Sequence, residues 1–333
     1  MVQKRQREKK ADLTAQKFKE RITLMKYTKK LKKLLCTGLI GGLILGCLTG
    51  CGDEKEPTVQ TTGEVTTAPQ ETSNTPSAIE TEKPSTPQGE VVFYGPEDKT
   101  CTSYVIPEGV TKINHHAFEG CTSLTSIKIP EGVTEIGVGA FQDCTSLTNI
   151  EIPNSVTVIR NVAFKNCTSL TSIKIPEGVT EIELDTFNDC SSLTSVDIPN
   201  SVTRISGEAF MDCSSLTSIE IPEGVISIGA HAFEGCTSLT SVELPSSITV
   251  IGNSAFYGCT SLTSIEIPNG VTKIDGAVFS RCTSLTSIEI PNSVTEMGGM
   301  NFSKCDALET IKVPEGMDVS DWGLSDSVQI IYY

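Results

Sequence analysis

The chain has 333 residues, of which 38% are hydrophobic, 20% charged and only 5% aromatic, which is too apolar for a disordered protein and too aromatic-poor for an ordinary globular enzyme core. Its formal net charge of −15 is unevenly placed, because residues 1–35 carry thirteen Lys or Arg against three acids, whereas the remainder carries 13 basic and 38 acidic side chains. Such an acidic remainder would repel phosphate backbones and anionic lipid, so we expect no nucleic-acid partner and no direct contact of the folded part with a membrane surface.

The first predicted element is an export signal. Residues 34–52 are uncharged and follow a basic cluster, a pattern typical of a secretory signal. The apolar stretch ends in Leu48-Thr49-Gly50-Cys51, which resembles the lipobox of bacterial lipoproteins. The resemblance implies that Cys51 is acylated and becomes the mature N-terminus. We therefore expect residues 1–50 to be a signal-peptide region and the chain to be exported and anchored in the membrane by lipid alone.

Alternatives stay open for this segment. Cys47 is a second acylation candidate, less favoured because apolar residues continue after it. An uncleaved transmembrane helix is a further alternative. Signals usually have about 15 to 30 residues, so Met25 is the expected true start, and the competing interpretation of the residues before it is a cytoplasmic basic amphipathic stretch.

The second predicted element is a tether. After Cys51, residues 52–90 are rich in Thr, Pro, Glu and Ser and contain almost nothing that can be buried. Segments of this composition cannot offset the entropy lost on folding. We therefore expect residues 51–90 to comprise the lipidated cysteine and a disordered linker that holds the next domain away from the membrane.

Residues 91–333 are predicted to form a single repeat domain. Cys, Phe and Leu each recur nine times with a period of 23, as from Cys121 to Cys305, and an aliphatic residue followed by Pro recurs ten times. Residues 121–143 and 167–189 match at 18 of 23 positions. Units of this size cannot bury an apolar face alone and must stack on their neighbours. The period therefore predicts a solenoid with ladders of identical side chains in its core.

One unit shows the expected path of a coil. Ile127 and Ile129 alternate with polar residues, which predicts a short strand with one buried face. Pro130 cannot donate a ladder hydrogen bond and should end that strand. Val133 and Ile136 should point the next segment inward. Stacked coils would then form a parallel sheet with equivalent residues about 4.8 Å apart.

The repeat C-x-x-L-x-x-I-x-I-P-x-x-V-x-x-I-x-x-x-A-F resembles the BspA-like, treponemal-type leucine-rich repeats over about residues 101–316. The resemblance implies a mainly β, curved, right-handed solenoid with a concave parallel sheet. It implies surface display with adhesion or protein binding as the function. It brings no catalytic residues with it.

The ends of the repeat region depart from the pattern, as solenoid ends do. Residues 91–94 and 101–104 are predicted to form an N-terminal cap. At the other end, residues 328–333 are predicted to form a closing strand, and Trp322 is expected to seal the core.

The candidates for catalytic or metal chemistry are weak. The nine periodic cysteines lack the short spacing and nearby histidines of zinc sites, and we expect them to be reduced core residues, with disulfides as the open alternative. His116 and His231 share a column five coils apart and cannot form one site. No nucleophile or phosphate-loop motif occurs. We therefore expect no enzyme activity, no catalytic residues, no metal and no cofactor.

The exposed position of the predicted strand forms the candidate binding strip. Five consecutive units place a carboxylate there, at Asp197, Glu220, Glu243, Glu266 and Glu289. Stacked like charges repel one another, so their presence needs an explanation. Two interpretations stay open. The carboxylates have arisen by sequence drift within duplicated units and add solubility, or they dock a basic partner or divalent cations. A second candidate surface is the variable stretch at 137–139, 160–162 and 183–185.

These patterns predict a cell-surface lipoprotein on the extracellular face of a bacterial cell. Its solenoid would bind an extracellular or cell-surface protein, or a glycan. The alternative function is an envelope scaffold that acts by self-association or by contact with the cell wall.

Overall fold

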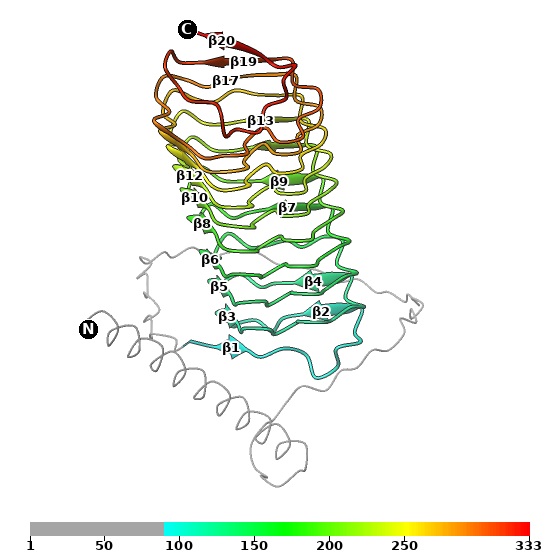
Figure 1. Ribbon diagram of the computed structural model, residues 1–333. Coiled ribbons are helices and arrows are strands. Elements are labelled where there is room, and N and C mark those ends of the chain that lie inside the picture. The colour runs from blue at the N-terminus through cyan, green and yellow to red at the C-terminus, as the bar shows by residue number, and fades with distance from the viewer. Residues whose placement is uncertain (1–89) are drawn as a thin grey trace, which may run out of the picture. The chain divides into compact units, whose positions relative to one another are not determined.

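Residues 90–333, which the computed structural model describes, form a parallel β-solenoid of 23-residue coils with no helix (Figure 1). These residues belong to one compact unit with a continuous hydrophobic core. The predicted leucine-rich repeat solenoid is therefore confirmed. The export signal, the acylation of Cys51 and the linker fall outside the described residues and stay predictions.

The first ladder is built from the predicted strand of each unit. Its paired strands are parallel and in register, but strand pairing is interrupted between β9 and β11 and between β15 and β17. In the coil at 149–151 a single bridge from Lys128 to Glu151 takes the place of a strand. In most strands the middle residue is buried and its neighbours face solvent, because side chains alternate across a strand. The strands are β2 (Ser103–Val105), β4 (Ser126–Lys128), β7 (Ser172–Lys174), β9 (Ser195–Asp197), β11 (Ser218–Glu220), β13 (Ser241–Glu243), β15 (Ser264–Ile265), β17 (Ser287–Glu289), β19 (Thr310–Val313) and β20 (Gln329–Tyr332).

A second parallel ladder, which the sequence did not predict, follows the Pro-containing turn of each coil. Between β3 and β16, each of its two-residue strands buries one aliphatic side chain, such as Ile136 in β5. Thr side chains reinforce the stack, as where Thr134 Oγ1 donates to the carbonyl oxygen of Thr111 at 3.1 Å. The strands are β1 (Val92–Phe93), β3 (Lys112–Ile113), β5 (Glu135–Ile136), β6 (Val158–Ile159), β8 (Glu181–Ile182), β10 (Arg204–Ile205), β12 (Ser227–Ile228), β14 (Val250–Ile251), β16 (Lys273–Ile274) and β18 (Glu296–Met297).

The remainder of each coil is a turn that also bonds to its neighbours. Phe118 N donates to the carbonyl of Ala140 and Phe141 N to that of Ala163, each one coil further on. Two residues per turn have positive φ, such as Val162 at 54° and Asn166 at 59°. Asn tolerates this conformation, whereas β-branched Val is strained in it.

The core consists of stacked columns. Adjacent Phe rings from Phe118 to Phe302 lie 5.2 to 6.1 Å apart between centroids, with interplanar angles of 1 to 12°. Each ring buries a large apolar area. Trp322 is 1% exposed and lies 5.9 Å from the Phe302 ring, which confirms that it seals the core.

Candidate functional site

The exposed column of the first ladder carries the acidic strip. In β11, Ile219 is buried while Ser218 and Glu220 face solvent. Parallel in-register pairing stacks equivalent side chains, so that Glu220 lies beside Glu243. The structure brings all five carboxylates of the strip to one exposed face on five consecutive coils, namely Asp197, Glu220, Glu243, Glu266 and Glu289.

The strip is neutralised at its two ends and not in its centre. Lys174 Nζ lies 3.1 Å from a carboxylate oxygen of Asp197, and Lys312 Nζ lies 3.3 Å from one of Glu289. Within residues 90–333, no basic nitrogen lies within 4.0 Å of the three central carboxylates. Unit charges about 4.8 Å apart repel by about 0.9 kcal/mol in water. The centre of the strip is therefore an uncompensated anionic surface.

The same face is hollowed over the last coils. A groove of about 550 Å³ is lined by side chains of β15, β17 and β19, including Glu289 and Lys312, and by Glu266, which directly follows β15. Ser264 and Ser287 also line it, and their hydroxyls can both donate and accept hydrogen bonds. The groove therefore presents carboxylate and hydroxyl oxygens together, a set that suits cationic or hydrogen-bond-donating groups.

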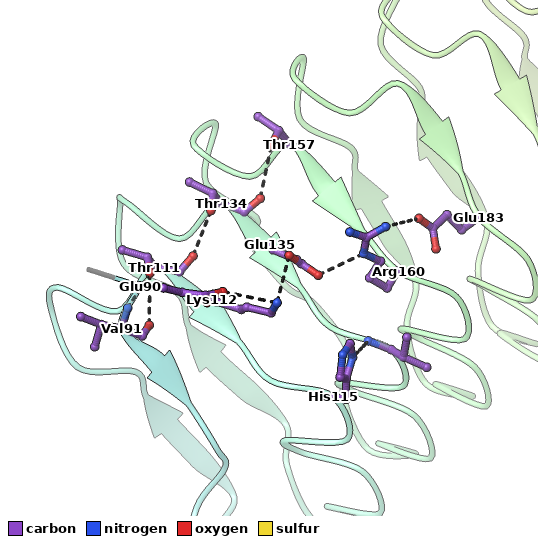
Figure 2. A network of polar contacts seen from close by, with 11 residues as sticks. Glu90, Val91, Thr111, Lys112, His115, Thr134, Glu135, Thr157, Arg160 and Glu183 are labelled. Atoms are coloured by element: carbon purple, nitrogen blue, oxygen red, sulfur yellow. Dashed lines mark hydrogen bonds and ion pairs between the residues drawn. The ribbon is translucent and has the colours of Figure 1, made fainter. Parts of the chain in front are cut away.

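The second candidate surface is occupied by its own ion pairs (Figure 2). Arg160 Nε lies 3.0 Å from Glu135 and its Nη1 lies 3.3 Å from Glu183, while Lys112 lies 3.2 Å from Glu135. Partial burial disfavours the charge on Glu135, but the hydrogen bonds from Arg160 and Lys112 outweigh it and lower the pKa of this carboxyl. These charges compensate one another across coils, so this surface holds the stack together more than it offers free charge.

The nine periodic cysteines are buried and free, as expected of core residues. Eight of the thiols also donate a hydrogen bond backward, for example from Cys144 Sγ to the carbonyl of Phe118 at 3.2 Å and from Cys213 Sγ to that of Phe187 at 3.2 Å. Burial raises the pKa of Cys144 and of Cys190 to about 12. Thiols held protonated in this way are poor nucleophiles and poor metal ligands.

The histidines lie apart on the turns. His116 faces Glu119 at 3.4 Å, and His231 faces Glu234 in the equivalent turn five coils away. His115 Nδ1 instead accepts a hydrogen bond from Val138 N at 2.8 Å (Figure 2). In the part of the chain that the structure describes, no three His, Cys, Asp or Glu side chains are grouped to hold a metal ion.

Sequence reasoning missed the hydrogen-bonding role of the cysteine column. The nine units all keep Cys where Ala or Val would fill a similar volume, and that uniformity is the signal for a donor at this position. It also missed that Lys174 and Lys312 pair with the ends of the strip, although both belong to the same 23-residue column.

Acylation of Cys51 lies outside the described residues. Within 90–333, the search for a helix long and apolar enough to cross a membrane finds none.

Comparison with known proteins identifies a family and several similar proteins. A family model for the BspA type leucine-rich repeat region matches residues 89–217 and 205–327. A leucine-rich cell surface protein from Faecalibacterium prausnitzii is 32% identical, with 69% of this chain and 79% of that chain covered and a TM-score of 0.39. A T. pallidum leucine-rich repeat protein is 26% identical, with 67% and 85% covered and a TM-score of 0.39. A leucine-rich repeat protein from Bacteroides ovatus is 24% identical, with 73% and 87% covered and a TM-score of 0.46. No curated protein sequence matches the chain.

Proposed function

This chain belongs to the BspA-type leucine-rich repeat family, and from that premise we propose that it is a bacterial surface lipoprotein whose solenoid binds another protein. One relative is described as a cell surface protein. Acylation at Cys51 would anchor the chain, and residues 52–90 would hold the solenoid away from the bilayer. The solenoid would act by binding, without catalysis, since stacked coils supply an extended surface of the kind used for recognition.

The observation that carries this proposal is the uncompensated centre of the acidic strip. Glu220, Glu243 and Glu266 are exposed on consecutive coils, and none of them has a basic neighbour among residues 90–333. Their mutual repulsion is relieved when cationic groups dock against them. The groove beside Glu266 offers the partner a concave surface in addition to the negative charge of the strip. We infer that the partner presents Lys or Arg side chains to this strip, with charge complementarity aiding encounter and register.

The test compares two variants with equal charge change. The chain from Thr81 onward has its own core and is used in soluble form. Its binding to immobilised matrix proteins, mucins and intact cells is measured at low and physiological salt. The strip variant carries Glu220→Gln, Glu243→Gln and Glu266→Gln. The control variant neutralises three exposed turn carboxylates, through Glu108→Gln, Glu131→Gln and Glu177→Gln.

Saturable binding that the strip variant loses and the control variant keeps is the expected result. Binding kept by both variants would refute the acidic strip as the site. Absence of saturable binding to every probe would refute the binding function itself.

A further inference from the structure

Exposed apolar side chains gather at the two ends of the solenoid. Of nine large hydrophobic residues that are markedly exposed within 90–333, six lie in the terminal coils. The exposed fraction is 66% for Val105 and 76% for Tyr94 at one end, and 49% for Tyr332 and 37% for Ile331 at the other. The sides of the solenoid are polar by comparison, so the ends are the surfaces on which association would bury apolar area.

Both ends of the first ladder are open strand edges. Among residues 90–333, no strand of the first ladder lies beyond β2 at one end or beyond β20 at the other. Gln329 N and Tyr333 N donate toward the preceding coil, to Glu309 and Val313, so the alternate amides of Ile330 and Tyr332 face away from β19. Proteins commonly protect such edges with Lys, Pro or a bulge, and β20 (Gln-Ile-Ile-Tyr) has neither Lys nor Pro.

The two ends are complementary halves of one coil. At the N-terminal end the second ladder begins with β1, whereas the first ladder begins one coil later with β2. At the C-terminal end the first ladder extends to β20, whereas the second ladder stops at β18. Within the described residues, β1 therefore lacks a first-ladder strand in its own coil, and both β19 and β20 lack a second-ladder strand. A β20 strand and a β1 strand would together complete a coil.

The side chains at these edges also match. Val105 is in register with Lys128, and Ile331 with Lys312, so both belong to the exposed column that carries the acidic strip. That column is charged in every coil between Lys128 and Lys312 and apolar only at its two ends. Continuing the same register beyond β20 would place Ile331 beside Val105, an aliphatic cross-strand pair of the kind that stabilises sheets.

The core columns continue in the same way. Ile330 is in register with Ile311, and Tyr104 with Ile127, so the same step would place Ile330 beside Tyr104 at the seam.

We propose that the solenoid associates head to tail with a second copy of this chain, with β20 of one copy pairing in parallel with β2 of the next. Each open edge is thus covered by the opposite end of another copy. The two strands would pair in the same parallel way as the strands of adjacent coils inside the solenoid. The contact is heterologous and does not close on itself, so it produces linear arrays. It uses the ends of the solenoid and does not depend on the proposed binding strip.

The test uses one blocking substitution at each end of the chain from Thr81 onward. Val105→Glu is designed to block the N-terminal edge and Ile331→Glu the C-terminal edge, since each replaces one partner of the aliphatic pair at the seam with a carboxylate. Tyr332→Pro is a second C-terminal block, which removes an amide that faces away from β19. Ile226→Glu is the matched control, because Ile226 is 55% exposed on the side of the solenoid.

The readout is the weight-average mass by sedimentation equilibrium from about 10 µM to 1 mM, a range suited to a small and weak interface. The unblocked chain and Ile226→Glu are expected to grow beyond dimers with concentration, and each blocked variant is expected to stay monomeric. An equal mixture of Val105→Glu and Ile331→Glu should stop at dimers, because one intact β20 edge and one intact β2 edge remain. Thermal unfolding of each variant checks that the fold is retained.

Three results would overturn the proposal. The first is a monomeric unblocked chain at the highest concentration. The second is association of folded, blocked variants that equals that of the unblocked chain. The third is a Val105→Glu variant that dimerises alone, which would show tail-to-tail pairing of two β20 strands.

Discussion

The cysteine column predicts a steep loss of stability at alkaline pH. Nine buried thiols have a pKa raised by burial, to about 12 at Cys144 and Cys190 and to about 11 at Cys305. In the unfolded chain a thiol ionises near pH 8.5. The folded state therefore binds these protons more tightly, so the stability they contribute is complete below about pH 8.5 and is lost as pH rises toward their folded pKa values.

The expected loss is large because eight thiols, from Cys144 to Cys305, act together. Each thiol that ionises in the unfolded chain but stays protonated in the folded protein lowers the free energy of unfolding by about 0.4 kcal/mol at pH 8.5 and about 1.4 kcal/mol at pH 9.5. For eight thiols the sums are about 3 and about 11 kcal/mol, against a typical domain stability of about 5 to 15 kcal/mol. The solenoid should therefore unfold between about pH 9 and 10.

The assay is guanidinium unfolding of the chain from Thr81 onward, followed by circular dichroism in reductant at a series of pH values. The comparison variant carries Cys213→Ala, Cys236→Ala and Cys259→Ala. It loses three of these eight thiols, so its free energy of unfolding should fall with pH about three eighths less steeply above pH 9. Equal slopes for the two proteins would refute the reasoning, as would thiolate absorbance near 240 nm appearing at pH 9.5 in the folded protein.

Three further predictions concern stability at neutral pH. Neutralising the three central carboxylates of the acidic strip to Gln should raise the free energy of unfolding by about 1 to 2 kcal/mol at low salt, and a gain that persists in molar salt would contradict a Coulombic origin. Val162→Gly should stabilise the chain by about 1 kcal/mol in denaturant unfolding, because Val162 is strained at its φ of 54°. Gly139, at the equivalent position of the preceding coil, adopts a similar φ of 59° without strain. A loss of stability would show that the side-chain packing of Val162 outweighs its backbone strain. Phe233→Ala should cost about 3 to 5 kcal/mol, since its ring stacks 5.3 and 5.4 Å from the rings on either side, and a cost near that of an exposed residue would mean that the column repacks around the gap.

The period of 23 residues accounts for most of what could be predicted about the fold. Identical units can bury their apolar faces only against one another, so the positions of Phe, Leu, Ile and Cys in one unit predicted the core columns in all of them. The alternation around Ile127 predicted the first ladder, and Trp322 and the closing strand β20 were predicted from their departure from the repeat. The acidic strip followed as well, because a period of one coil turns a sequence column into a spatial row.

Other features depend on how neighbouring coils sit against each other. The second ladder uses strands of only two residues, too short to show a period of their own, and it forms because stacking has already brought equivalent backbones into register. The bond from each of eight cysteine thiols to a Phe carbonyl spans 26 residues and exists only between stacked coils. In the same way, a single sequence column contains both Lys and Glu. Only the stacked structure shows that Lys174 and Lys312 neutralise the ends of the strip and that its centre has no basic partner within residues 90–333. The tertiary structure alone also shows that the described part of the solenoid, residues 90–333, starts on its second ladder and ends on its first. That offset arises from the shortened terminal coils and not from the repeat itself.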